Sequence, residues 1–238
     1  MKRTKKYIAL LIGLVAVGIA VRVLAHDSWV EPGMGPVFRV LYGHKAPEPY
    51  KFVKVTLVNA IDAAQHPLKF SRTETPDGLT IKTMGGRPVL FAVEFDNGYW
   101  VTVGNERRNI RQSQLPAGTK STDPSRPLKF SKTILTWQPW MARPLGQRIE
   151  FVPQGLTELP KAGATMRLRL LFDGKPLGNQ MVENNSNEQG PKTDANGYVT
   201  VTVLKGTNRF ATDHDITQPT DADGRRLGLT AALVFVAK

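Results

Sequence analysis

Apolar and polar residues alternate along most of the chain after residue 36, with the two-residue period of a half-buried β-strand. The alternating stretches are rich in Val, Thr, Phe and Tyr, and turn-forming residues bound them, as is typical of strands. In the first half of the chain they are residues 37–43, 50–62, 79–84, 88–95 and 99–104. Between the last two, Asn97 and Gly98 predict a hairpin turn, since both residues tolerate positive φ.

A second block of alternation begins near Gly146, with expected strands within residues 147–155, 165–185, 191–206 and 227–238. The polar stretch 105–130 is expected to connect the two blocks, and residues 131–136 suggest a helical turn. Turn signals recur roughly every 8 to 12 residues, which indicates antiparallel β-sandwiches. We therefore expect an all-β protein after an N-terminal signal helix. Its parts are a signal peptide over 1–25, an N-terminal β-sandwich domain over 26–145, and a C-terminal immunoglobulin/transthyretin-like domain over 146–238.

The first 25 residues have the layout of a secretory signal peptide. Four basic residues within positions 2–6 precede an apolar run over residues 7–21, and a Val-Leu-Ala sequence ends at Ala25. The run has 15 residues, whereas a membrane-spanning helix needs about 20. We therefore expect cleavage after Ala25 and a periplasmic protein, with an uncleaved N-terminal membrane anchor as the alternative.

Composition narrows the functional classes. The chain has no cysteine, so it can offer neither disulfide bridges nor thiolate ligands. The net charge of +12 falls to +7 without the five basic residues of positions 1–25, and no basic stripe is interleaved with aromatic residues as in nucleic-acid-binding proteins. Neither a nucleophile elbow, a zinc-protease helix motif nor a nucleotide-binding loop occurs. We expect a binding protein, not an enzyme, with no nucleic-acid partner; the oligomeric state is open.

An ordered set of phrases carries a family resemblance across nearly the whole mature chain. They are AHDSWVEP at the mature start, YGHKAPEPY at 42–50, KFSKTIL at 129–135, IEFVPQG at 149–155, RLLFDGKPLGNQMV at 169–182 and TDANGYVTVTV at 193–203. Together they resemble a periplasmic domain-of-unknown-function family described as nickel-uptake-transporter-like. The resemblance implies an all-β, soluble metal-handling protein linked to cobalt or nickel import.

The chain contains four histidines, and the first of them has unusual chemistry if Ala25 is removed. His26 would then offer its α-amino nitrogen and its imidazole Nδ1 to one metal ion. The pKa of a free α-amine is about 8, so a metal ion displaces its proton easily at neutral pH. Imidazole nitrogen suits nickel, copper, zinc and iron.

The other candidate ligands come from distant parts of the chain. His44 follows the first expected strand after Gly43, and His214 precedes the last strand, with Asp215 placed to bind the metal or to orient the imidazole. The family resemblance implies the same trio of histidines: His26, His44 and His214. His66 has no matching position and is expected to be a surface residue in a turn.

These observations favour a periplasmic protein that captures a divalent transition metal ion, with nickel or cobalt favoured and copper or zinc possible as cofactor. Its expected partner is a membrane metal importer or an outer-membrane receptor system. One alternative is a carbohydrate-binding or structural β-sandwich module that uses Trp137 and Trp140. A second alternative is a copper redox protein with a histidine brace, although a third histidine would crowd the open position that oxygen needs.

Overall fold

The computed structural model describes residues 26–185 and 190–238. This part of the chain is all-β, as expected, and its strands form three sheets with short 3-10 helices at Phe52–Lys54 (η1), Gln112–Gln114 (η2) and Pro139–Ala142 (η3). The signal helix predicted over 1–25 lies outside the described residues. Within the described residues, no helix has both the length and the apolar character to cross a membrane.

The largest sheet, called here the central sheet, has eight strands. Six follow one another across it: β13 (Glu183–Asn184), β15 (Gly206–Thr217), β16 (Arg226–Ala237), β9 (Thr122–Ile134), β6 (Leu90–Asp96) and β3 (Val55–Ile61). The short strands β7 (Trp100–Val103) and β8 (Glu106–Arg108) extend it beside β9. β9 and β16 run parallel, and the other pairs are antiparallel.

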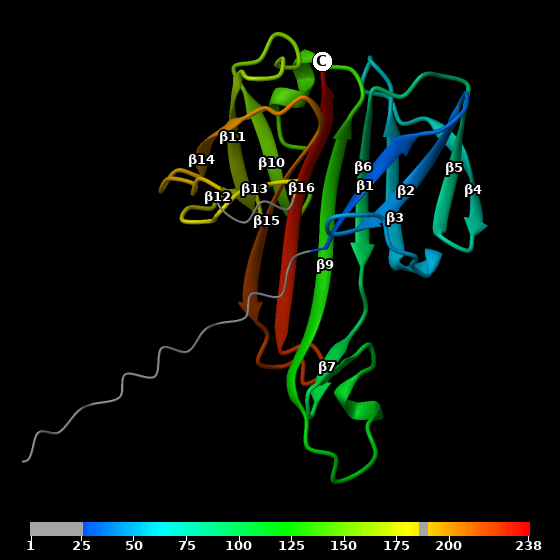
Figure 1. Cartoon of the computed structure of the whole chain (residues 1–238), viewed down its shortest axis with the longest axis vertical. Coiled ribbons are helices and arrows are strands. Elements are labelled where there is room, and N and C mark those ends of the chain that lie inside the picture. Colours follow the sequence, from blue (N-terminus) through cyan, green and yellow to red (C-terminus); the bar gives the residue numbers. More distant parts are fainter. Residues whose placement is uncertain (1–25, 186–189) are drawn as a thin grey trace, which may run out of the picture.

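Two smaller sheets cover the central sheet. The N-terminal sheet has the order β1 (Asp27–Pro32), β2 (Val37–Gly43), β5 (Gly78–Met84) and β4 (Lys69–Thr75). The C-terminal sheet contains β10 (Ile149–Gln154), β11 (Thr165–Phe172), β12 (Lys175–Pro176) and β14 (Tyr198–Thr202). Figure 1 shows them as separate groups of strands beside the long β9, β15 and β16, whose lower ends extend beyond both groups toward β7.

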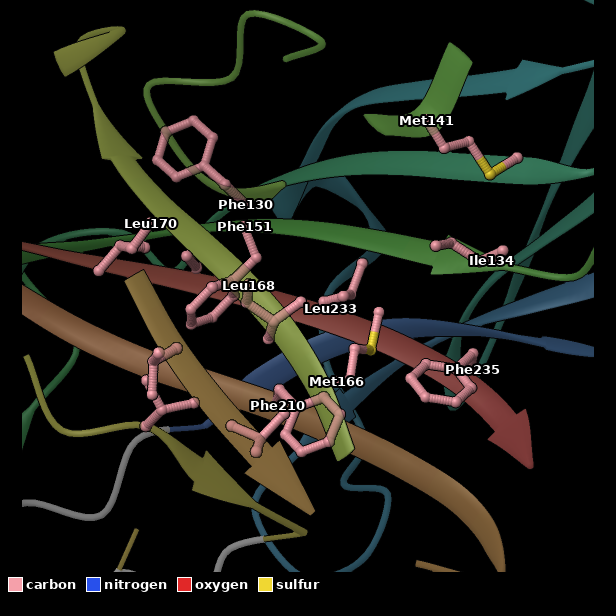
Figure 2. Close-up of a cluster of buried hydrophobic side chains, with 14 of the residues drawn as sticks. Phe130, Ile134, Met141, Phe151, Met166, Leu168, Leu170, Phe210, Leu233 and Phe235 are labelled. Atoms are coloured by element: carbon pink, nitrogen blue, oxygen red, sulfur yellow. The ribbon is translucent and has the colours of Figure 1, made fainter. Parts of the chain in front are cut away.

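The covering sheets lie on opposite faces of the central sheet, as the alternation along β6 shows. Phe91 and Val93 belong to the core beneath the N-terminal sheet, whereas Leu90 and Ala92 belong to the core beneath the C-terminal sheet. Figure 2 shows the second core, where Phe151, Met166 and Leu168 of the C-terminal sheet lie among side chains of the central sheet. The face on which a strand residue lies therefore decides which half of the molecule it contacts.

The segment 105–130, which the sequence predicted to be a connection, contains much of the longest strand. β9 spans Thr122–Ile134 and pairs with β6, β7 and β16. Its first half is polar and contains two prolines, which hide the strand signal. The helical turn suggested over 131–136 is wrong, because residues 131–134 continue this strand. Strands from both sides of residue 145 consequently share the central sheet.

Candidate metal centre at the start of the first strand

The antiparallel pairing of β1 with β2 brings two of the predicted ligands together. Asp27 pairs with Gly43 and Ser28 with Tyr42, so continuing this register by one residue places His26 opposite His44. Directly opposed residues of an antiparallel pair have neighbouring side chains. The two imidazole rings have centres 6.2 Å apart and are tilted by 47°. The pairing register of β1 and β2 therefore brings these two histidines together, although they are not neighbours in the sequence.

A tight turn after β2 presents His44. Gly43 adopts a φ of +154° and bridges to Pro47, and a Cβ at Gly43 would lie 2.0 Å from the backbone oxygen of Ala46. The Glu48 amide donates a hydrogen bond of 2.7 Å to the Tyr42 carbonyl, which closes the turn. His44 is buried at 6% exposure within this turn. The close approach explains why glycine stands before the histidine.

Glu48 and Tyr42 fix the orientation of the His26 ring. The Glu48 carboxylate accepts a hydrogen bond of 2.9 Å from His26 Nε2, and the Tyr42 ring stacks on the imidazole with centres 5.2 Å apart and planes 17° apart. An ionised carboxylate can only accept, so in the neutral ring Nε2 carries the proton and the lone pair lies on Nδ1. The contact thus places the lone pair on the nitrogen that would join the α-amine in a chelate.

Arg209 of β15 anchors the same region from the central sheet. Its guanidinium donates a hydrogen bond to the His44 carbonyl, lies 3.6 Å from an Asp27 oxygen, and stacks over the Trp29 ring at 4.3 Å. All four residues are buried. One arginine therefore connects the first strand, the His44 turn and the central sheet, which gives the two histidines a rigid base.

Further buried charged residues lie near Arg209, between β1 and the central sheet. Burial raises the pKa of Asp27 to about 7, while the positive charges of Lys129 and Arg209 act in the opposite direction. Burial likewise lowers the pKa of Lys129, which donates a 3.1 Å hydrogen bond to the Thr230 hydroxyl. Thr230 in turn donates to Asp213. These groups lie on the same face of the central sheet as Arg209 and form a polar layer under β1.

His214 lies on the other face of the central sheet. Side chains alternate along β15, so Arg209 faces β1, whereas Phe210 and His214 face the C-terminal sheet. The His214 ring packs at 5.0 Å from Phe172 of β11, and burial lowers its pKa. His214 is also five residues from Arg209, about 16 Å along a strand. The structure therefore brings His26 and His44 together and places His214 elsewhere.

The remaining candidates have ordinary surroundings. Asp215 forms an ion pair with Arg226 at 3.3 Å, and His66 is an exposed side chain 3.7 Å from Asp62. Trp137 is buried in the core, and the Trp140 indole donates a hydrogen bond to the Ala63 carbonyl. Within residues 26–185 and 190–238, side chains form no group of three or more histidine and carboxylate residues with metal-site geometry.

Sequence reasoning missed Glu48 and Arg209. Glu48 belongs to the turn that contains His44, so a predicted hairpin register would have placed it near His26. Arg209 offers no comparable local signal, because its contacts depend on how β15 crosses β1. It is a buried arginine in a strand whose hydrophobic alternation is weak.

Comparisons with known proteins support one part of the family resemblance, namely membership of a domain-of-unknown-function family. The family model for a domain of unknown function, DUF4198, matches residues 23–216. An uncharacterized protein of Haemophilus influenzae is 27% identical over 227 residues, covering 90% of this chain and 91% of that protein. No solved structure matches the chain. The comparisons thus confirm a domain-of-unknown-function family and leave its connection to nickel uptake untested.

Proposed function

The chain belongs to the DUF4198 family, and from this premise we propose that it is a periplasmic protein that captures a divalent transition metal ion. Nickel or cobalt is the favoured cargo, and delivery to a membrane importer is the proposed role. The observation that carries the proposal is the pairing of His26 with His44 at the start of the first strand. The family resemblance noted in the sequence supplies the choice of metal.

The spacing of the two rings fits a shared ion. A metal–nitrogen bond of about 2.0–2.1 Å puts an ion roughly 3 Å from each ring centre, so two ligating rings have centres at most about 6.5 Å apart. The observed separation is 6.2 Å. With the leader removed, the His26 amine would add a third nitrogen beside Nδ1. Nitrogen donors of this kind suit nickel, cobalt and copper.

Glu48 and Arg209 support this nitrogen set without binding the ion. Glu48 holds the His26 Nε2 proton, which selects Nδ1 as the ligand and makes the imidazole a stronger donor. Arg209 fixes the carbonyl of His44, so little chain entropy is lost when the ion binds. His214 lies too far away to belong to this set, so the histidine ligands that we propose are His26 and His44.

The decisive experiment measures nickel affinity by calorimetry on exported protein whose N-terminus has been established by intact mass. His26→Ala, with cleavage preserved, should abolish tight binding, and His44→Ala should weaken it at least tenfold. A mature chain extended by one alanine before His26 should lose affinity as well, since the amine becomes an amide. His66→Ala and His214→Ala are matched controls and should bind as wild type does. Undiminished affinity in the extended chain would reject the chelate.

The position of His214 also favours a second candidate, a copper redox protein with a histidine brace. Two histidines with one terminal amine leave an open coordination position, because the third histidine faces the other side of the central sheet. The copper-loaded protein would then oxidise a polysaccharide when given hydrogen peroxide. Soluble oxidised sugars from wild type, absent with His44→Ala, would establish this activity; metal binding without such products supports the carrier role.

A carbohydrate-binding module has less support in the geometry. The two tryptophans that suggested a sugar platform contribute to packing, since Trp137 lies in the core and Trp140 packs against it. Glycan binding that survives metal removal would be needed to restore this alternative.

A further inference from the structure

A pocket of about 910 Å³ lies between the N-terminal sheet and the central sheet, beside the second half of β1. Small-molecule sites commonly have volumes of about 300–1,000 Å³ and mostly apolar walls. The walls here fit that description, since they include Trp29, Phe38, Leu135 and Val234. Neither His26 nor His44 lines the pocket, so it is distinct from the candidate metal centre.

Two charged residues line the pocket, and they differ in whether another side chain already pairs with them. Glu31 is occupied, because it accepts a 3.0 Å hydrogen bond from the Trp29 indole and pairs with Arg39 at 3.4 Å. Arg87, the other charged lining residue, is exposed and forms no ion pair with any residue in the described ranges. An apolar pocket with one available cation is complementary to an apolar ligand with one negative charge.

Exposed apolar side chains gather around the same pocket. Val236 is 63% exposed and lines it, and Met34 is 90% exposed beside the lining residue Gly35. The Thr83 amide donates a hydrogen bond to the Pro36 carbonyl, and both residues also line the pocket. Exposed apolar side chains beside a pocket add to the apolar surface that a ligand can cover.

We propose that this pocket binds a small amphipathic monoanion, with an aliphatic or aromatic body and a single carboxylate. The body would lie against the wall formed by Trp29 and Val234, which pack together, and the carboxylate would pair with Arg87. This inference is independent of the metal-carrier proposal, because the two sites have no ligand residue in common.

The test uses calorimetry on the full mature protein without added metal, with decanoate as the probe. Decanol and decyltrimethylammonium have the same chain with neutral and positive heads. Decanoate should bind at least tenfold more tightly than either of them. Arg87→Gln should weaken decanoate binding about five- to tenfold and leave decanol binding unchanged, since an exposed charge-assisted contact is modest. Arg225→Gln, a change of an exposed arginine away from the pocket, should have no effect.

A matched pair of surface variants tests the location. Val236→Asp places a negative charge at the pocket and should weaken decanoate binding more than tenfold. Val53→Asp makes the same change at a residue of almost equal exposure, 62% compared with 63%, away from the pocket, and should bind as wild type does. Absence of decanoate binding to wild type, equal binding of the cationic probe, or equal effects of the two aspartates would each overturn the proposal.

Discussion

At the residue scale, the ion pairs of the protein differ in how far they are exposed, and therefore in how strongly water screens the attraction between their charges. Lys132 and Glu150 are almost completely buried, whereas Asp123 is 39% exposed and lies between Arg107 and Arg226. Burial alone would raise the pKa of Asp123, but hydrogen bonds and charges from Arg226 and Arg107 outweigh it and lower the pKa below 3.8. The ionised form of Asp123 therefore stabilises the folded state.

Asp123→Asn should lower the free energy of unfolding at pH 7 by no more than about 1 kcal/mol, since partly exposed ion pairs contribute little. Because the folded-state pKa is depressed, this stabilisation is present above the ordinary pKa of 3.8 and is lost as pH falls through the lower folded value. Asparagine tolerates the left-handed backbone at this position, where φ is +52°.

Urea unfolding at pH 7 and at pH 2.5 measures the effect. Glu158→Gln is the control, since Glu158 is exposed and forms no ion pair with any residue in the described ranges. The difference between wild type and Asp123→Asn should shrink at the lower pH. A difference that stays constant across this range would mean that the charge of Asp123 does not contribute.

The candidate site shows which residue-scale features the sequence can predict. His26 and His44 could be chosen because a cleaved leader and a glycine turn give each a chemical context. The placement of His214 could not be predicted, since it depends on which face of β15 points toward β1. A shift of one residue in that strand would have reversed the outcome.

At the scale of elements, alternation predicts most strands well. The first expected strand, 37–43, coincides with β2, and the expected strand at 88–95 contains most of β6. The expected strand at 50–62 is longer than β3, because its first residues form a 3-10 turn. Alternation reports that one face of a strand is buried, but it does not report which strand lies next to it.

The turn after β2 is the element on which the candidate metal centre depends. Gly43→Ala would force a Cβ to within 2.0 Å of the Ala46 oxygen, so the turn must open. We expect a loss of about 2–4 kcal/mol in the free energy of unfolding, together with weaker nickel binding as His44 moves from His26. Thermal unfolding and calorimetry measure the two effects.

Gly35→Ala is the matched control for that prediction. Gly35 also has a positive φ, +61°, but a Cβ added there would meet open space. The substitution should therefore cost only about 1 kcal/mol and leave metal affinity unchanged. Equal losses of stability at the two glycines would show that the close contact with Ala46 is relieved without cost.

At the scale of the whole molecule, the parallel contact between β9 and β16 joins the two sequence blocks. β9 comes from the first block and β16 from the second, and they pair over ten residues from Arg226–Ser125 to Phe235–Ile134. Hydrophobic periodicity cannot predict such a pairing, because it contains no information about distant partners. We therefore expect the described part of the chain to unfold in one cooperative transition.

A buried ion pair provides the test of this cooperativity. Lys132 of β9 pairs with Glu150 of β10 across the core between the central and C-terminal sheets, and Glu150 also accepts hydrogen bonds of 2.9 Å from the Leu145 and Gly146 amides. Lys132→Met leaves the Glu150 charge buried without its partner. The expected loss is about 3–5 kcal/mol in the free energy of unfolding, since breaking a buried pair from one side is costly.

The double variant Lys132→Met/Glu150→Gln should recover most of that loss, because glutamine removes the charge and still accepts a hydrogen bond from the chain. Arg148→Gln breaks an exposed pair with Asp173, 3.5 Å apart, and should cost less than about 1 kcal/mol. Urea unfolding followed by tryptophan fluorescence and by far-UV circular dichroism should give coincident curves for every variant. If Lys132→Met instead separates the two curves, the sheets unfold independently, and the β9–β16 pairing does not make them one cooperative unit.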